Sequence, residues 1–265
     1  MDPKNPKTLE SFVRSLETVA GLIKQRNPDV IVAPMMGAIP FIDVLNVVDP
    51  NFPNDKVVYV PASNKVHKVE QVMAGAFGNI ISALTPDGGS YLAIDEVVSG
   101  GSAQNVFKRF GAARSAYSRR KTLDLYGPTA NFKDKPVGDH ETSVRASIKY
   151  NTIGIVDAKA TKRSAYQEMV DRGIMLPVPT DCIVTMDRTD FLPFGYKTGH
   201  DDQGRLVHLP VVDCFTVSPA YIDFLISVSQ VLGTNMQDVT VRNMAKIRDS
   251  YKWVPEELRT LPKRS

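Results

Sequence analysis

Residues 91–102 (Tyr-Leu-Ala-Ile-Asp-Glu-Val-Val-Ser-Gly-Gly-Ser) constrain the fold more strongly than any other stretch of the chain. The first four residues are apolar, as expected for a parallel strand that is covered on both faces. Asp95 and Glu96 follow at the carboxyl end of this predicted strand, where open α/β sheets bind their ligands. Because neighbouring strand residues point to opposite sides, at least one of the two carboxylates can face the binding crevice.

The second half of the stretch predicts a phosphate-binding loop. Residues 99–102 are small, and a helix is expected over residues 103–110. A loop of this kind before a helix N-terminus exposes backbone N–H groups that bind anions. Together with an acid pair that can accept hydrogen bonds from a sugar diol, the loop suggests a ribose 5-phosphate as ligand. The alternative interpretation is a plain strand–turn–helix with a serine N-cap and two solvated acids.

The stretch resembles the signature of the type I phosphoribosyltransferases, which has four apolar residues, two acids, two apolar residues and a Ser/Thr/Gly loop. The resemblance implies that Asp95 and Glu96 hold the ribose hydroxyls of phosphoribosyl pyrophosphate (PRPP). It also implies that the 5-phosphate is bound by the loop residues Ser99, Gly100, Gly101 and Ser102.

The pattern along the rest of the chain favours the same fold class. Helical spacing of apolar residues and short apolar runs alternate, which predicts a doubly wound, mostly parallel α/β sheet, as the resemblance also implies. Helices are expected at residues 9–26, 40–48, 73–84 and 161–172. Strands are expected at residues 30–33, 56–60, 122–126, 153–156, 183–186 and 206–212, with a long polar loop at 127–142.

The segment after residues 30–33 is a candidate pyrophosphate-binding loop. By resemblance, backbone N–H groups of Met36, Gly37 and Ala38 would bind the pyrophosphate of PRPP. Many family members have an Arg or Lys in this loop, and this chain has neither between Pro34 and Ala38. A plain strand–helix turn that needs glycine is the alternative.

A basic segment follows the strand expected at residues 56–60. The resemblance implies a mobile catalytic loop here, which closes over PRPP and offers cations to the departing pyrophosphate. The candidates are Lys65, His67 and Lys68, with Lys65 assigned to catalysis and Lys68 to PRPP binding. A solvated surface loop is the alternative.

Two later segments resemble the base-binding parts of the purine-type phosphoribosyltransferases. Residues 155–159 and 190–196 imply that Lys159, Phe194 and Tyr196 contact the base, although the acid expected after Tyr196 is replaced by Gly199. Core aromatics at a strand end are the alternative. Between His200 and His208, Gln203 and Gly204 are interpreted as a hairpin turn, and two histidines eight residues apart with acids in a turn match no metal-ligand spacing.

The C-terminal fifty residues change in character. Ser218 and Pro219 predict an N-cap and first turn, with a helix to Leu232 and another from Thr234. We therefore expect an α/β core over residues 1–214 and a helical C-terminal subdomain over residues 215–265, the last fourteen forming a trailing arm.

Composition limits the possible partners. The net charge of +3 is too small to indicate nucleic acid or a membrane surface, and two cysteines without metal-ligand spacing argue against a disulfide scaffold or structural zinc. The N-terminus has no apolar signal core, so we expect a cytoplasmic protein without membrane contact.

The function expected from the resemblance is transfer of ribose 5-phosphate from PRPP to a nucleobase, purine-type favoured, with Mg²⁺ as cofactor and a homodimer as the family's usual assembly. Because of the missing loop cation and the extra C-terminal helices, a non-catalytic PRPP- or nucleotide-binding regulatory protein is the alternative. A nucleotide hydrolase or transferase acting on a macromolecule is a third hypothesis.

Overall fold

The computed structural model describes residues 6–97, 99–157, 164–180, 194–215, 217–234 and 243–261. Its centre is a five-stranded parallel sheet in the order β2-β1-β3-β4-β5, which confirms the predicted mostly parallel α/β class. The strands are β1 (Val30–Met35), β2 (Val57–Pro61), β3 (Gly89–Val97), β4 (Ile148–Asp157) and β5 (Met175–Thr180). All residues of β1 and β2 are buried, as expected for central strands of near-continuous apolar sequence.

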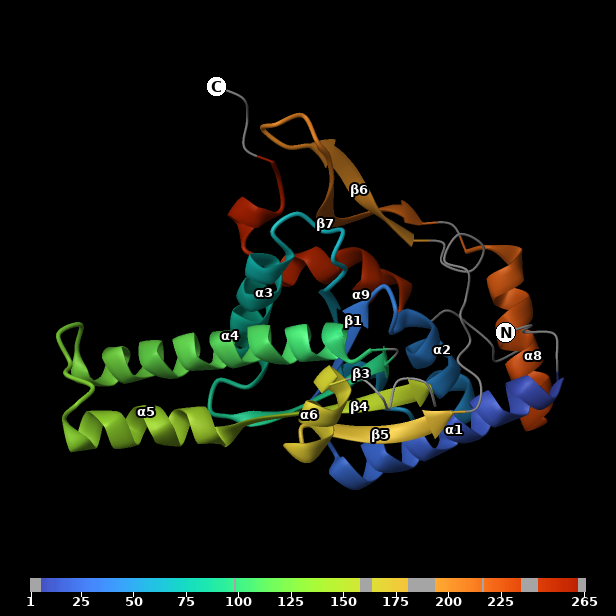
Figure 1. Ribbon diagram of the computed structural model, residues 1–265, viewed down its shortest axis with the longest axis horizontal. Coiled ribbons are helices and arrows are strands. Elements are labelled where there is room, and N and C mark those ends of the chain that lie inside the picture. Colours follow the sequence, from blue (N-terminus) through green and yellow to red (C-terminus); the bar gives the residue numbers. More distant parts are fainter. Residues whose placement is uncertain are drawn as a thin grey trace.

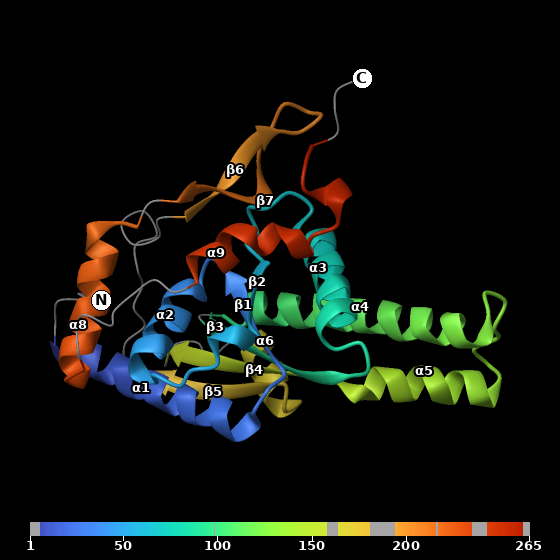
Figure 2. The same cartoon turned by 180° about the vertical axis from the view of Figure 1, so that it is seen from behind.

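Helices cover the sheet in two groups (Figure 1; Figure 2). On one side, α1 (Pro6–Arg26), α2 (Ile39–Val48) and α8 (Pro219–Leu232) contact one another. The other side carries α3 (Val69–Leu84), α4 (Gly101–Tyr126) and α6 (Ser164–Asp171). Helix α4 contacts both α3 and α6. This division follows from right-handed crossovers, because the chain moves in opposite directions along the sheet after β1 and after β2.

The prediction of a strand at residues 122–126 and a loop at 127–142 is wrong. α4 continues without a break to Tyr126, and α5 (Lys135–Ser147) returns alongside it as a helical hairpin that extends beyond the sheet (Figure 1). β4 pairs directly with β3 along its whole length, so no strand lies between them in the sheet. Thr122 is compatible with the helix because its hydroxyl donates to the Ser118 carbonyl at 2.9 Å.

Strand β5 has no counterpart among the predicted strands. It contains Pro177 and Pro179, which cannot donate ladder hydrogen bonds, and it lies at the edge of the sheet, where proline is tolerated. The strand expected at residues 183–186 lies outside the described residues.

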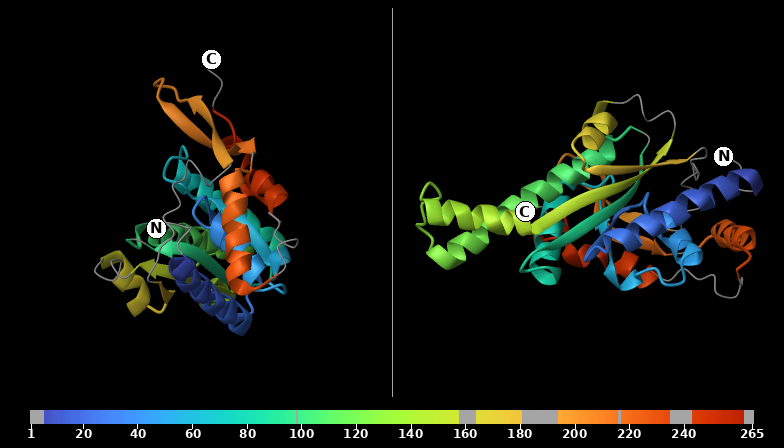
Figure 3. Two further views of the ribbon diagram at one scale, coloured as in Figure 1. Left: turned by 90° about the vertical axis from the view of Figure 1, so that its right-hand side faces the viewer. Right: turned by 90° about the horizontal axis from the view of Figure 1, so that it is seen from below.

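A separate antiparallel pair stands above the sheet (Figure 3). It consists of β6 (Phe194–His200) and β7 (Leu206–Phe215), and β7 confirms the strand expected at residues 206–212. The predicted turn is also present: Gly204 has φ +76°, and the Asp201 carboxylate accepts hydrogen bonds from the backbone N–H groups of Gln203 and Arg205 at 2.9 Å.

The C-terminal segment packs on the core. The N-cap of α8 is confirmed, since the Ser218 hydroxyl accepts from the Tyr221 backbone N–H at 3.1 Å. Beyond it lie α9 (Met244–Arg248), η4 (Asp249–Trp253) and η5 (Glu256–Leu258). The prediction of a trailing arm is wrong for residues 252–261. Val254 is fully buried, and the Trp253 carbonyl accepts a hydrogen bond from the side-chain amide of Asn79 on α3. The proposed boundary at residue 215 stays a prediction.

None of the described helices is long and apolar enough to cross a membrane.

Candidate functional site

A cavity of about 490 Å³ opens where β1, β2 and β3 end at the same edge of the sheet. Met35 pairs with Pro61, so the chain leaves β1 and β2 at the same level. The walls come from the loops after these three strands and from the β6–β7 pair. The predicted site residues that line the cavity are Met36, Gly37, Lys65, Asp95, Glu96, Ser99, Gly100, Ser102 and Tyr196.

The position of this cavity follows from the strand order. β1 and β3 are neighbours, and their crossovers leave toward opposite ends of the sheet, β1 toward β2 and β3 toward β4. The two following loops therefore diverge and leave a crevice between them, which is where open α/β sheets bind ligands.

The acid pair lies in this crevice. Asp95 is 6% exposed, whereas Glu96 is half-buried, in agreement with the opposite directions of adjacent strand residues. A β-carbon added to Gly37 would lie 3.7 Å from the nearer Asp95 carboxylate oxygen. The loop after β1 and the first acid of β3 thus face each other across a short distance.

The loop after β1 contributes less than the resemblance implies. The backbone N–H of Ala38 donates to the Pro34 carbonyl at 3.1 Å, and Ala38 is fully buried outside the cavity lining. Met36 and Gly37 line the cavity. Of the three predicted amide donors, Ala38 is therefore already engaged within the protein.

The predicted phosphate loop leads directly into the N-terminus of helix α4. Gly100 has φ +80°, which favours glycine, and α4 begins at the next residue. The hydroxyl-bearing residues Ser99 and Ser102 are exposed toward the cavity, so both are accessible to a ligand. The positive end of the α4 dipole adds to the attraction for an anion.

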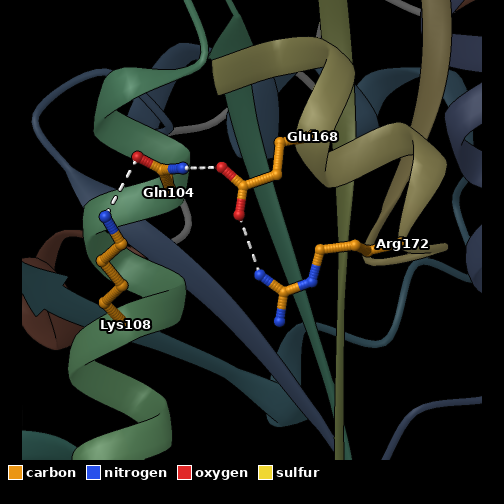
Figure 4. A network of polar contacts seen from close by, with 4 residues as sticks. All are labelled: Gln104, Lys108, Glu168 and Arg172. Carbon is orange, nitrogen blue, oxygen red and sulfur yellow. Dashed lines mark hydrogen bonds and ion pairs between the residues drawn. The ribbon is translucent and has the colours of Figure 1, made fainter. Parts of the chain in front are cut away.

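Helix α6 packs tightly against this loop. A β-carbon on Gly100 would come within 2.6 Å of the Tyr166 backbone nitrogen. Figure 4 shows how the two helices are joined one turn further on: Gln104 donates to Glu168 at 2.8 Å, and Glu168 pairs with Arg172 at 2.9 Å. Only glycine fits at position 100 because both its φ angle and this close approach exclude a side chain.

The basic loop after β2 is held by strand β7. Val66 is buried, and the His67 backbone N–H donates to the His208 carbonyl at 2.8 Å. Lys65 reaches the cavity lining, but His67 and Lys68 do not. Lys68, in a left-handed conformation with φ +51°, immediately precedes α3. Among the described lining residues Lys65 is the only lysine or arginine.

The β6–β7 pair closes one side of the cavity with Gly195, Tyr196 and His208. Burial raises the pKa of the Tyr196 phenol, which therefore stays protonated at neutral pH and can act as a donor. Lys159 lies outside the described residues, as does the side chain of Phe194. His208 was not among the predicted site residues, because nothing in the sequence indicates that the strand expected at residues 206–212 faces the cavity.

The carboxylates of the cavity are ligands of the kind that magnesium accepts. No cluster of three or more His, Cys, Asp or Glu side chains occurs in the described part of the chain. Mg²⁺ bound to a phosphorylated substrate typically needs only one or two carboxylates from the protein. Asp95 and Glu96, which both line the cavity, fit that requirement.

No family model, curated protein or solved structure matches this chain, so the function is inferred from the geometry of the site.

Proposed function

We propose that the protein is a phosphoribosyltransferase, which moves the ribose 5-phosphate of PRPP to a nucleobase and releases pyrophosphate. A purine is the favoured class of base. The observation that carries the proposal is the cavity at the β1–β3 crevice, which the Asp95–Glu96 pair shares with Ser99, Gly100 and Ser102 of the 99–102 loop, whereas the predicted Gly101 is outside the lining. Carboxylates suit a sugar diol, and a helix N-terminus with two hydroxyls suits a phosphate.

In the proposed reaction, the bond between C1 of the ribose and the pyrophosphate oxygen breaks, and a bond from C1 to a base nitrogen forms. The electron pair of the broken bond leaves with pyrophosphate, and the proton of the base nitrogen passes to the released pyrophosphate or to solvent. Positive charge grows on the ribose ring in the transition state, and the carboxylates of Asp95 and Glu96 offset it. The 99–102 loop anchors the phosphate, so that remote binding energy aligns C1.

The leaving group has one cationic side chain available among the described lining residues. Lys65 can stabilise the negative charge that grows on pyrophosphate, since it reaches the cavity from the loop after β2. Asp95 and Glu96 would hold Mg²⁺ together with the substrate, and the metal would supply charge neutralisation at the leaving oxygens.

The test is phosphorus NMR of PRPP and Mg²⁺ with the protein and a panel of purine and pyrimidine bases. Pyrophosphate that appears only with a particular base is the expected result. The Lys65→Ala variant should lower turnover far more than PRPP affinity, because Lys65 acts on the leaving group. The Lys24→Ala variant, changed at an exposed lysine in the last turn of α1, serves as the matched control.

A non-catalytic PRPP- or nucleotide-binding regulatory protein is the second candidate. It is favoured by the scarcity of cations in the described lining and by the engaged amide of Ala38. In the same NMR experiment it predicts unchanged PRPP, with resonances that broaden with the wild type but not with the Asp95→Asn/Glu96→Gln variant.

A further inference from the structure

The β6–β7 pair presents two buried polar atoms to the same region of the molecule. The Tyr196 hydroxyl and His208 Nδ1 are both shielded from water; the hydroxyl has the Ala62 backbone beside it, and Nδ1 has no hydrogen-bond partner among the described residues. Both residues line the 490 Å³ cavity. Thr198 pairs directly with His208, whereas Tyr196 pairs with Val212 beyond an irregularity in the ladder, so it is the shared cavity lining that brings the two side chains together.

Buried polar atoms without a partner are rare, because their desolvation is not compensated. The Tyr196 hydroxyl faces the backbone of Ala62 at the start of the basic loop, which gives it a nearby polar group. His208 Nδ1 has no hydrogen-bond partner in the described residues. The imidazole is therefore the polar group of this wall that most needs a ligand.

The backbone of His208 is fixed on both sides. Its carbonyl accepts from the His67 N–H, and the residue pairs with Thr198 across the strands. A rotation of the ring about χ2 exchanges its two edges, so that either edge of the imidazole can face a ligand in the cavity that His208 lines. A neutral imidazole has one donor and one acceptor nitrogen, so it can bind either kind of heteroatom at the edge of a base.

We propose that His208 contacts the acceptor substrate and determines which base is accepted. The inference rests on the proposed function. In that reaction the 99–102 loop and the acid pair bind the ribose phosphate, so the β6–β7 wall is the part of the cavity that remains to bind the base that is joined to C1. The substrate class is a planar heteroaromatic base with a ring nitrogen or exocyclic oxygen at the edge that meets the imidazole. A site built around such a hydrogen bond discriminates strongly against an analogue that lacks the matching atom.

The test compares His208→Leu, which keeps the bulk but removes the hydrogen bond, with His208→Asn, whose side-chain amide places a polar atom near the position of Nδ1. His200→Leu is the matched control, because His200 is exposed on β6 and outside the cavity lining. The measurements are KM for the best base at saturating PRPP and the dissociation constant of PRPP by calorimetry.

We expect His208→Leu to raise KM for the base about ten- to hundredfold while the PRPP dissociation constant stays within about twofold. His208→Asn should recover most of the loss, and His200→Leu should behave as the wild type. An unchanged KM in His208→Leu overturns the inference but leaves the proposed function intact. An equal weakening of base and PRPP also overturns it, because that pattern indicates general damage to the site.

A wild type that forms no pyrophosphate with any base overturns the proposed function instead. In that case calorimetry of the purine and pyrimidine panel with PRPP-saturated protein decides the inference separately. Base binding that His208→Leu abolishes and His208→Asn restores supports the contact without turnover. Absence of base binding to the wild type overturns both proposals.

Discussion

Two aspartates in different regions are buried to a similar extent and face very different surroundings. Asp95 is 6% exposed and lines the cavity at the carboxyl edge of the sheet. Asp43 is 1% exposed within α2, where it accepts a 2.5 Å hydrogen bond from the Tyr221 hydroxyl of α8. Burial raises the pKa of the Asp43 carboxyl to about 7, although the hydrogen bond from Tyr221 acts in the opposite direction.

The difference shows that burial alone does not identify a functional acid. An acid beside a cavity can exchange protein contacts for contacts with a ligand, whereas an acid enclosed between packed helices is stable mainly in its neutral form. Asp43 instead joins α8 to α2, and the nearby Tyr59 and Tyr221 have pKa values raised well above the usual phenol value by burial. We expect Asp95 to be needed for activity and Asp43 to control stability.

The largest effect is expected at the cavity. Asp95→Asn combined with Glu96→Gln should lower PRPP turnover on the order of a thousandfold, because the charge that offsets the transition state is removed. Thermal unfolding should show no loss of stability. The Asp43→Asn variant is the control for turnover and should retain wild-type rates; if it lost activity to the same extent, the distinction between the two aspartates would fail.

Asp43 should dominate the pH dependence of stability. Burial raises its pKa from the ordinary value of about 3.8 to about 7 in the folded protein, so the folded state binds the proton more tightly. The free energy of unfolding should therefore fall by roughly 4 kcal/mol as pH rises from about 4 to about 7, and then level off. Asp43→Asn removes this contribution. Urea unfolding at pH 4 and pH 8 should show the variant gaining about that much relative to the wild type; parallel profiles would contradict the prediction.

A smaller effect is expected at the phosphate loop. Gly100→Ala should destabilise the fold by about 2 kcal/mol, because alanine disfavours φ +80° and its β-carbon would meet the Tyr166 backbone. Ribose 5-phosphate affinity, measured by calorimetry, should fall as well. Gly111→Ala is the matched control within the same helix; nothing lies within 4 Å of its added carbon, so it should stabilise α4 by about 0.5–1 kcal/mol. If the two variants changed the free energy of unfolding by the same amount, alanine at position 100 would not be strained.

The smallest effect is expected where α4 meets α6 (Figure 4). The side chains of Glu168 and Arg172 are 50% and 55% exposed, so their ion pair is screened by solvent. Glu168→Ala should lower the free energy of unfolding by at most about 0.5 kcal/mol, as measured in urea. A loss above about 1.5 kcal/mol would show that this exposed network, rather than the packing at Gly100, holds α6 in place.

The sequence predicted those parts of the fold in which local pattern and tertiary packing agree. The apolar run before Asp95 and the small residues after it indicate strand β3 and the loop before α4 from local sequence alone, and the distant contacts of β3 agree with that pattern. Residues 122–126 were mistaken for a strand because their alternating apolar side chains suit a strand, whereas contact with α5 holds them in a helix.

Other features depend on contacts across the chain and left no local signal. Asp43 meets Tyr221, which is 178 positions away, and nothing near either residue indicates the pair. His208 reaches the cavity only because β7 pairs with β6 and hydrogen-bonds the basic loop. The α5 start was detectable, since Asp134 precedes a first turn with proline, a combination typical of a helix N-terminus.

The chain contains a single tryptophan, Trp253, and it lies where the C-terminal segment meets α3. Lys252 places its ammonium group 5.0 Å from the centre of the indole ring, so the ring has a defined neighbour in the docked segment. Intrinsic fluorescence excited at the indole therefore reports on this one junction, without a label and without background from another tryptophan. Release of the segment from α3 can be followed separately from unfolding of the sheet, for which far-ultraviolet circular dichroism provides the second signal.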